Sequence, residues 1–482
     1  MGIYRTNNPL EYDQVDGIII DERAPAPSVQ GVGTGVALLI GQFPRGPLDS
    51  IQEPGSQQAI VELFGKSFSY PGYVALLNKK FSRLKILRVA ASDAVKGTKT
   101  FDDGAATDII KFDAKYKGVY GNSIKITIEA GSTTGRKYTI TDENEFAVIA
   151  PEVYDDIVIT DIDEFTFANS KLVDVTVLAT SAEPEVTAAT DLAGGADGTI
   201  ADTDYETAIG LTKIEGVKNV LFLDVYNATR NTYLKLHAAE TQDNMCILAG
   251  AVDETVTAVE AAVATLRDTD GRLIYAFNWL ETLVNSVPTF VSPASFYASI
   301  LSQTAPQIDP AYSGNTQFLY GVSAVKQNLS RADFIRLMEA GVSSFENDLD
   351  IGIKIRSGIV TQIANSSKLT VVRRRMTDYL TNSVAGFLKL YQNDVNSDDK
   401  RIAVKAAVLD FDRREEQSGA LPTDNEVQGG VAKIVDIETL NTDETIAEGK
   451  FFIQYKRRIY SSMRFIVLIA EIGESVVVTE GE

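Results

Sequence analysis

The chain has 482 residues, a length that predicts roughly two to four domains with room for large cores. Its 45 Lys and Arg residues against 66 Asp and Glu residues give a formal net charge of −21, which argues against a nucleic-acid binder because phosphates would be repelled. One cysteine excludes an internal disulfide, and one histidine leaves too few ligands for a metal site of the His/Cys type.

Residues 1–25 are predicted to form an extended N-terminal arm. The start lacks the apolar run of a signal peptide. The β-branched run Gly17-Ile18-Ile19-Ile20 predicts a strand without a hairpin partner beside it. A lone strand leaves backbone groups unpaired, so it either packs on its own domain or joins a sheet of another subunit.

Residues 26–95 and 196–350 are predicted to form one α/β core domain. Short apolar runs alternate there with longer amphipathic segments, a rhythm that predicts a largely parallel sheet covered by helices. The expected strands are 36–40, 219–225, 245–249, 273–277 and 289–291, and the expected helices are 229–240, 254–267 and 294–303.

Residues 96–195 differ in kind from this core. They show alternating runs such as 123–128 and 171–178 with turns between them and no helical period, which predicts an inserted β-rich outer domain. The run Gly194–Gly198 is expected to be a flexible exit from it.

Residues 351–472 are predicted to form a C-terminal α+β domain, followed by an extended arm over 473–482. The expected order is strands 355–363 and 369–373, helices 376–390 and 400–417, and an antiparallel pair of 451–457 with 463–470. The arm carries a second isolated β-branched run, Val476-Val477-Val478.

A search for reactive or ligand-binding residues returns no catalytic, cofactor or metal candidate. His237 lies in a helical segment and is expected at a surface or interface, and Cys246 lies in an apolar run and is expected to be a buried, inert thiol. Gly31–Gly35 precedes its strand, whereas a phosphate loop must follow one. Asp268–Gly271 lacks the outer carboxylates of a calcium loop and is expected to be a turn. The apolar runs, such as 465–470, are too short to span a membrane.

Basic residues form three small clusters: Arg373–Arg375, Lys456–Arg458, and Lys400 with Arg401 and Lys405. On an acidic chain these clusters are either solvated charge or a surface that faces an acidic partner.

A series of short strings resembles, in the same order, the sheath proteins of contractile phage tails, tailocins and related contractile injection systems. The strings are 26–47 with Arg45-Gly46-Pro47, 63–65, 73–81, 84–89, 118–122, 192–195, 291–295, 328–330 with 339–342, 419–421 and 440–442. The family often has an aromatic-Pro-Trp step where this chain reads Ala276-Phe277-Asn278-Trp279.

This resemblance implies a structural, non-enzymatic protein without a cofactor. Copies are expected to stack as hexameric rings in a helical sheath around an inner tail tube protein, between a baseplate and a tail terminator, and to contract so that the tube penetrates the cell envelope for genome ejection. The implied location is the virion tail, assembled in the host bacterial cytoplasm, with no direct contact to nucleic acid and no membrane insertion.

The resemblance also implies site residues. The arms carrying Ile18, Ile19, Ile20 and Val476, Val477, Val478 are expected to pair with the last strands of neighbouring subunits; the acceptor residues are Phe452, Ile453, Tyr455, Phe465, Val467 and Ile469. Lys400, Arg401 and Lys405 are the candidates to face the tube. A glycan-degrading tail enzyme and a receptor-binding adhesin remain alternatives, although neither needs two isolated terminal strands.

Overall fold

The computed structural model describes residues 2–5, 17–20, 28–77, 79–213, 216–223, 226–364 and 369–464. The chain forms two compact units, one of Gly33–Met376 with Ser461–Glu482 and one of Met1–Val32 with Thr377–Tyr460. The larger unit therefore extends beyond the boundary expected at 351. The division falls inside helix α8 (Val371–Leu388).

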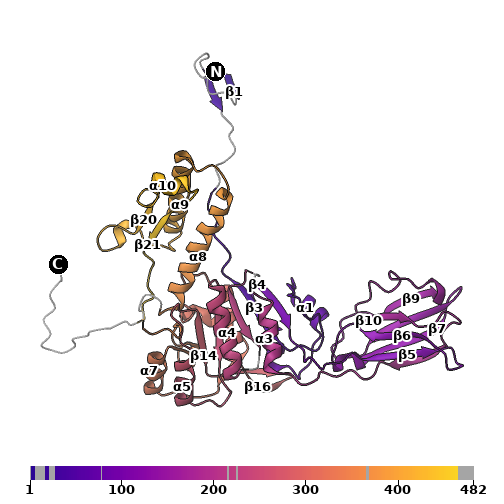
Figure 1. Cartoon of the computed structure of the whole chain (residues 1–482). Coiled ribbons are helices and arrows are strands. Elements are labelled where there is room, and N and C mark those ends of the chain that lie inside the picture. The colour runs from indigo at the N-terminus through magenta and orange to yellow at the C-terminus, as the bar shows by residue number, and fades with distance from the viewer. Residues whose placement is uncertain are drawn as a thin grey trace. The chain divides into compact units, whose positions relative to one another are not determined.

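A seven-stranded, mostly parallel sheet is the centre of the larger unit (Figure 1). Its order is β19-β18-β14-β13-β12-β3-β4, and only β19 runs antiparallel to its neighbour. The strands are β3 (Val36–Gly41), β4 (Arg83–Arg88), β12 (Asn219–Phe222), β13 (Met245–Ala249), β14 (Leu273–Phe277), β18 (Val342–Asp348) and β19 (Gly352–Ile355). The expected parallel sheet is confirmed.

Helices cover both faces of this sheet because successive strand residues point to opposite sides. In β14, Ile274 and Ala276 join one core, whereas Leu273, Tyr275 and Phe277 join the other. The first core is completed by α2 (Pro71–Leu77) and α6 (Pro293–Gln303), and the second by α3 (Asp202–Gly210), α4 (Ala228–Thr241), α5 (Val256–Leu266) and α7 (Arg331–Ala340). Helix α1 (Gln57–Phe64) precedes α2.

Several of the strings that carry the family resemblance are helix ends. Ser292 caps α6 by accepting the amide of Ala294, and Pro293 occupies the first turn, where its missing N–H costs nothing. Ser330 and Asp333 form a capping box at the start of α7. Gly341 ends α7 with a φ of 85°, which favours glycine.

The inserted region is a β module with its own apolar core. A three-stranded sheet has the order β10-β6-β5, and a four-stranded sheet has the order β11-β7-β8-β9. The strands are β5 (Thr98–Asp102), β6 (Asp108–Ala114), β7 (Ile124–Ala130), β8 (Arg136–Asp142), β9 (Glu152–Ile157), β10 (Val173–Val177) and β11 (Thr187–Asp191). The helices described between Thr98 and Asp191 are short 3₁₀ turns, so the expected β-rich character is confirmed.

A small antiparallel sheet was missed by the sequence reading. β15 (Leu280–Val284) pairs with β16 (Val287–Val291) on one side and with β17 (Val322–Val325) on the other. Asn285 and Ser286 form the β15–β16 turn with φ values of 52° and 61°. Only 289–291 were expected as a strand here.

The smaller unit contains helices α9 (Asp398–Gln417) and α10 (Asp443–Ala447), the end of α8, and two two-stranded sheets. β20 (Lys433–Asp436) pairs antiparallel with β21 (Gln454–Arg457). β1 (Gly2–Arg5) pairs in parallel with β2 (Gly17–Ile20).

Three expectations for the C-terminal region are corrected. Of the strand expected over 355–363, only Ile355 lies in a strand, as the last residue of β19, and Ile359 forms an isolated bridge with Thr370. The strand expected over 369–373 is largely the start of α8, because Val371, Val372, Arg375 and Met376 are buried at helical spacing. β21 pairs with β20, and the partner expected for it, 463–470, forms no strand at 463 and 464 and otherwise lies outside the described residues.

Candidate interaction surfaces

The described residues hold no group of three or more metal-ligating side chains. Within the same ranges, no helix is both long and apolar enough to cross a bilayer. Cys246 is fully buried, as expected, and this burial raises the pKa of its thiol. Asp268–Gly271 forms the expected turn, in which the Asp268 carboxylate accepts the amide of Arg272 at 2.8 Å.

His237 was expected at a surface or an interface, and this expectation is wrong because the side chain is buried within its own unit. Its side chain is only 3% exposed, inside the larger unit, because α4 turns this position toward α3 and the loop before β13. The amide Nδ2 of Asn244 lies 3.1 Å from His237 Nε2, and Nδ1 has no hydrogen-bond partner within the described ranges. Burial lowers the pKa of His237 to about 4, so the ring is neutral at pH 7.

In the described residues, β20 and β21 each have one edge without a strand neighbour, and the edge of β21 is the candidate acceptor. In the described part of the chain, β20 is the only strand that pairs with β21. Three of the predicted acceptor residues lie here: Tyr455 within β21, and Phe452 and Ile453 directly before it. The other three, Phe465, Val467 and Ile469, lie outside the described residues, as do Val476, Val477 and Val478.

A buried polar network fixes β21 against α9. Tyr455 donates its hydroxyl to Asp412 Oδ1 at 2.6 Å, and the Asp412 side chain is fully buried. Arg457 donates to Glu416 Oε1 at 2.9 Å, and Lys433 of β20 donates to the same oxygen at 2.5 Å. Burial raises the pKa of Asp412 despite the nearby cations. The hairpin is therefore tied to the helix by charge-assisted bonds.

Each of the three tube-facing candidates already has an acidic partner in its own unit. Lys400 pairs with Asp394, and Lys405 Nζ lies 3.3 Å from Glu438 Oε1. Arg401 is buried and bonds to Asp398 and to both oxygens of Asn396, so it fixes the start of α9. Lys400 and Lys405 remain the partly exposed members of this set.

The other basic clusters are also largely structural. Arg375 is buried and donates to the carbonyl oxygens of Leu301 and Thr304, both at 2.8 Å, at the end of α6. Arg457 belongs to the network on α9, and Arg458 donates to the Gln428 carbonyl at 2.8 Å. A run of basic residues is commonly a solvent-exposed face. Here apolar residues near these arginines, at helical or strand spacing, could have indicated that Arg375 and Arg457 lie on buried faces.

β2 confirms the strand expected at Ile18, Ile19 and Ile20. However, the structure gives it a parallel partner, β1, with Ile18 opposite Ile3. This pairing is not a hairpin, and it agrees with the first of the two alternatives, in which the strand packs within its own chain; whether the strand also joins a neighbouring subunit stays a prediction. Among the described residues, each of the two strands still has one edge without a strand neighbour.

Arg45, in the Arg-Gly-Pro string, joins the core to the β module. Its guanidinium donates to the Tyr120 hydroxyl at 2.5 Å, to Asp142 Oδ2 at 3.1 Å and to the Glu62 carbonyl at 2.7 Å. Both Arg45 and the Asp142 side chain are buried. Gly46 has a φ of 120°, and a Cβ there would lie 2.6 Å from the Phe64 ring, so the string is specified by local geometry.

The exit expected to be flexible is held at the same junction. Gly195 donates its amide to Asn122 Oδ1 at 2.8 Å and accepts from Asn122 Nδ2 at 2.9 Å. Val95 and Ala196 form an isolated antiparallel bridge, so the two chain crossings lie side by side. This arrangement is typical of an insertion into a surface loop.

Comparison with known proteins decides the fold. No family model and no curated protein sequence matches the chain. Among solved structures, a sheath tail protein from Listeria innocua matches 89% of this chain and 96% of its own length, with a TM-score of 0.64 and 16% identity. A sheath tail protein from Desulfitobacterium hafniense matches 92% of this chain and 100% of its own length, with a TM-score of 0.63 and 15% identity. A chain from the helical sheath of the anti-feeding prophage in its contracted state matches 95% of this chain and 99% of its own length, with a TM-score of 0.58 and 14% identity.

This chain has the fold of a contractile-tail sheath protein. The sheath fold here includes the core sheet, the inserted module and the smaller unit, since the matches cover nearly the whole chain. The resemblance read from scattered strings is thereby confirmed at the level of the fold.

Proposed function

We propose that this chain is the structural subunit of a contractile sheath, polymerising as stacked hexameric rings around an inner tube and contracting to drive the tube through a cell envelope. The supporting observation is the near full-length similarity to sheath proteins, one of which forms a helical sheath in the contracted state. In this role the chain is not an enzyme and needs no cofactor, because contraction is a repacking of subunits.

We further propose that strand addition links the subunits. Both β1–β2 and β20–β21 are two-stranded in the described residues, so their outer edges lack a strand neighbour. The open edge of β21, held by the Asp412 network, is suited to accept a strand from a neighbouring copy. Ile18–Ile20 and Val476–Val478 are the candidate donors.

The partners follow from the same proposal. They are further copies of the chain, an inner tube protein, a baseplate and a terminator, in a virion tail assembled in the bacterial cytoplasm. Lys400 and Lys405 are proposed to contact an acidic strip on the tube, whereas Arg401 is proposed to position the start of α9 for that contact. Screened charge contacts of this kind allow the sheath to slide during contraction.

Electron microscopy of the purified protein tests the proposal. The full chain is expected to form tubes or stacked rings, and deletion of Ser475–Glu482 is expected to leave a folded monomer that does not polymerise. The matched control replaces Val476–Val478 with three threonines, which keeps strand propensity and backbone pairing and should retain polymers. Normal tubes from the deletion contradict the role of the arm, and a wild-type chain that stays monomeric contradicts the sheath function.

The tube contact needs a separate measurement. Changing Lys400 and Lys405 to Glu is expected to reduce co-assembly with tubes at low salt, where exposed charges matter most, while leaving tube-free polymers intact. Arg401→Glu is excluded from this test because its loss should disturb the fold of α9. Unchanged co-assembly of the Lys400→Glu/Lys405→Glu variant contradicts the assignment.

A further inference from the structure

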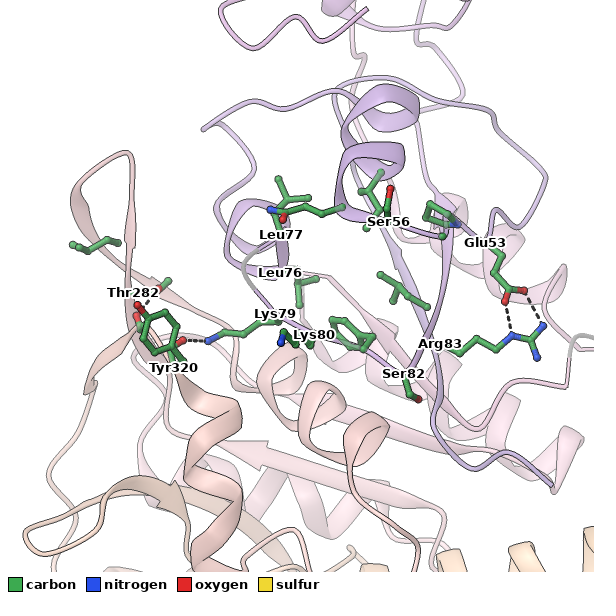
Figure 2. Close-up of a pocket in the computed structure, with 18 residues that line it drawn as sticks. Glu53, Ser56, Leu76, Leu77, Lys79, Lys80, Ser82, Arg83, Thr282 and Tyr320 are labelled. Carbon is green, nitrogen blue, oxygen red and sulfur yellow. Dashed lines mark hydrogen bonds and ion pairs between the residues drawn. The ribbon is translucent and has the colours of Figure 1, made fainter. Parts of the chain in front are cut away.

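A large pocket in the larger unit has no role in the sheath assembly proposed above. Its volume is about 1150 Å³, and it lies between the segment before α1, the end of α2, the start of β4 and the β15–β17 sheet (Figure 2). Leu76, Leu77, Phe81 and Leu283 give it an apolar lining. Tyr320, 84% exposed, stands at its rim. The pocket can therefore hold several side chains.

The charge of this pocket is opposite to that of the chain. Its described lining carries Lys79, Lys80 and Arg83 against one carboxylate, Glu53. Arg83 and Glu53 neutralise each other in a two-pronged pair at one end of the view in Figure 2. Two lysine charges therefore remain on a protein whose net charge is −21.

Neither lysine has an acidic partner among the described residues. Lys79 donates to the Tyr320 carbonyl, and its ammonium lies 4.8 Å from the centre of the Phe296 ring. This partial burial lowers the pKa of Lys79 to about 8. An arriving carboxylate would therefore meet one cation, Lys79, that has already lost part of its hydration, where a charge pair is stronger than in open water. The second cation, Lys80, is solvent-exposed and available for pairing.

A matching projection lies on another part of the same unit. Between β18 and β19, Leu349 is fully exposed and Ile351 is 42% exposed. Asp348 builds this hairpin turn by accepting the amides of Asp350 and Ile351, and it pairs with Lys354. The Asp350 carboxylate is exposed and has no partner in the described chain. The tip thus presents one leucine and one unpaired acid together.

The cationic end of the pocket and the tip belong to different edges of the core sheet. Arg83 begins β4, one edge strand, whereas the tip joins β18 to β19, the opposite edge strand. The wall of the pocket around Tyr320 belongs to elements that contact β19 in the same copy. A contact from one edge of a subunit to the opposite edge of the next is heterologous, and such contacts build rings or helices. Because copies of an acidic chain repel one another, a cationic pocket that receives an acidic tip also offsets this repulsion.

We propose that the β18–β19 tip of one copy docks into this pocket of a neighbouring copy, with Leu349 against the apolar lining and Asp350 beside Lys79 and Lys80. The proposal rests on the proposed sheath function, since it needs repeated copies of the chain. It adds a second contact between subunits that is independent of strand addition.

Charge exchange tests this contact. Lys80→Glu and Asp350→Lys are each expected to raise the critical concentration for polymerisation by about tenfold or more, because each places like charges together. The double variant Lys80→Glu/Asp350→Lys is expected to recover most of this loss. Leu349→Ser is expected to weaken polymerisation without recovery by either charge change. Lys80 is preferred to Lys79 because Lys79 also packs on Phe296 within its own subunit.

Lys389→Glu, on an exposed lysine of the smaller unit without an ion pair among the described residues, is the control for a simple increase in negative charge and should polymerise normally. Single variants that polymerise like the wild type, or a double variant no better than either single one, overturn the docking. A wild-type chain that forms no polymer overturns the sheath function and this contact together. Wild-type polymers with unaffected variants overturn the docking alone.

Discussion

The single histidine makes one prediction unusually direct. His237 is 3% exposed, and its Nε2 faces the Nδ2 amino group of Asn244, which can only donate, at 3.1 Å, with the Thr212 hydroxyl farther away at 3.5 Å. Protonating the ring would place two donors against each other in a buried site. Acidification should therefore destabilise the core of the larger unit through this residue.

The magnitude follows from the pKa difference between the folded and the unfolded chain. The folded pKa is about 4, against an ordinary value of 6.5. Each pKa unit corresponds to about 1.4 kcal/mol, so the largest loss in the free energy of unfolding is about 3.5 kcal/mol. Because the folded pKa lies below the unfolded one, the loss is absent above pH 6.5 and grows as the pH falls toward 4.

His237→Gln is the matched variant, since it keeps a polar side chain that does not titrate. The difference in unfolding midpoint between wild type and variant should be constant from pH 8 to about 6.5 and should then shift in favour of the variant as pH falls. Carboxylates titrate in the same range in both proteins, so the comparison removes their contribution.

A nuclear magnetic resonance titration gives the independent check, because one histidine yields one imidazole signal. The expected midpoint in the folded chain is close to pH 4. A midpoint near 6.5, or parallel pH profiles for the wild type and His237→Gln, would refute the reasoning.

Three further predictions concern the junction, the module and the hairpin. Replacing residues 96–195 with a short Gly-Ser linker should leave a soluble core by circular dichroism, because the bridge between Val95 and Ala196 closes the neck; loss of soluble folding would show that the module belongs to the core. Asp142→Asn should lower the stability of the junction by about 3–5 kcal/mol, because it leaves the buried Arg45 charge uncompensated. Amide hydrogen exchange at residues 118–123 should therefore be faster in this variant than in the double variant Arg45→Met/Asp142→Asn, which removes both charges. Equal exchange rates in the two variants would contradict this prediction. Tyr455→Phe should cost about 1–3 kcal/mol, because Asp412 loses its buried donor, and unchanged urea unfolding of the smaller unit would show that this bond does not hold the hairpin.

Regular alternation explains how much of the fold was predictable. The runs 245–249 and 273–277 coincide with β13 and β14. A short, wholly apolar run between two helical segments is typical of a strand that is buried on both faces of a parallel sheet. The strand expected over 369–373 failed because β-branched Val371 and Val372 favour strands locally, whereas packing of Arg375 and Met376 favours a helix. Local propensity cannot decide such a case.

The candidate surfaces were less predictable than the fold. The sequence predicted a strand over 451–457, which contains β21, but it did not predict β20, its partner, because Lys433–Asp436 is too short to show alternation. Charge runs at 373–375 and 456–458 did not reveal that Arg375 and Arg457 are buried, since burial depends on distant carbonyl and carboxylate partners. The pocket around Lys79 draws on four separate segments and has no local signature.

The fully buried state of Cys246 has a practical consequence. A thiol with a raised pKa and no solvent contact reacts slowly with maleimides, so the native chain behaves as a cysteine-free background for surface labelling. A cysteine placed at 350 and another at 80 could then be oxidised to a disulfide crosslink between two copies. In a separate experiment, dyes attached to cysteines on the N-terminal or C-terminal arm could follow the distance between copies as a sheath shortens. Rearrangement of the subunits can thus be measured by site-specific labelling without replacing the native cysteine.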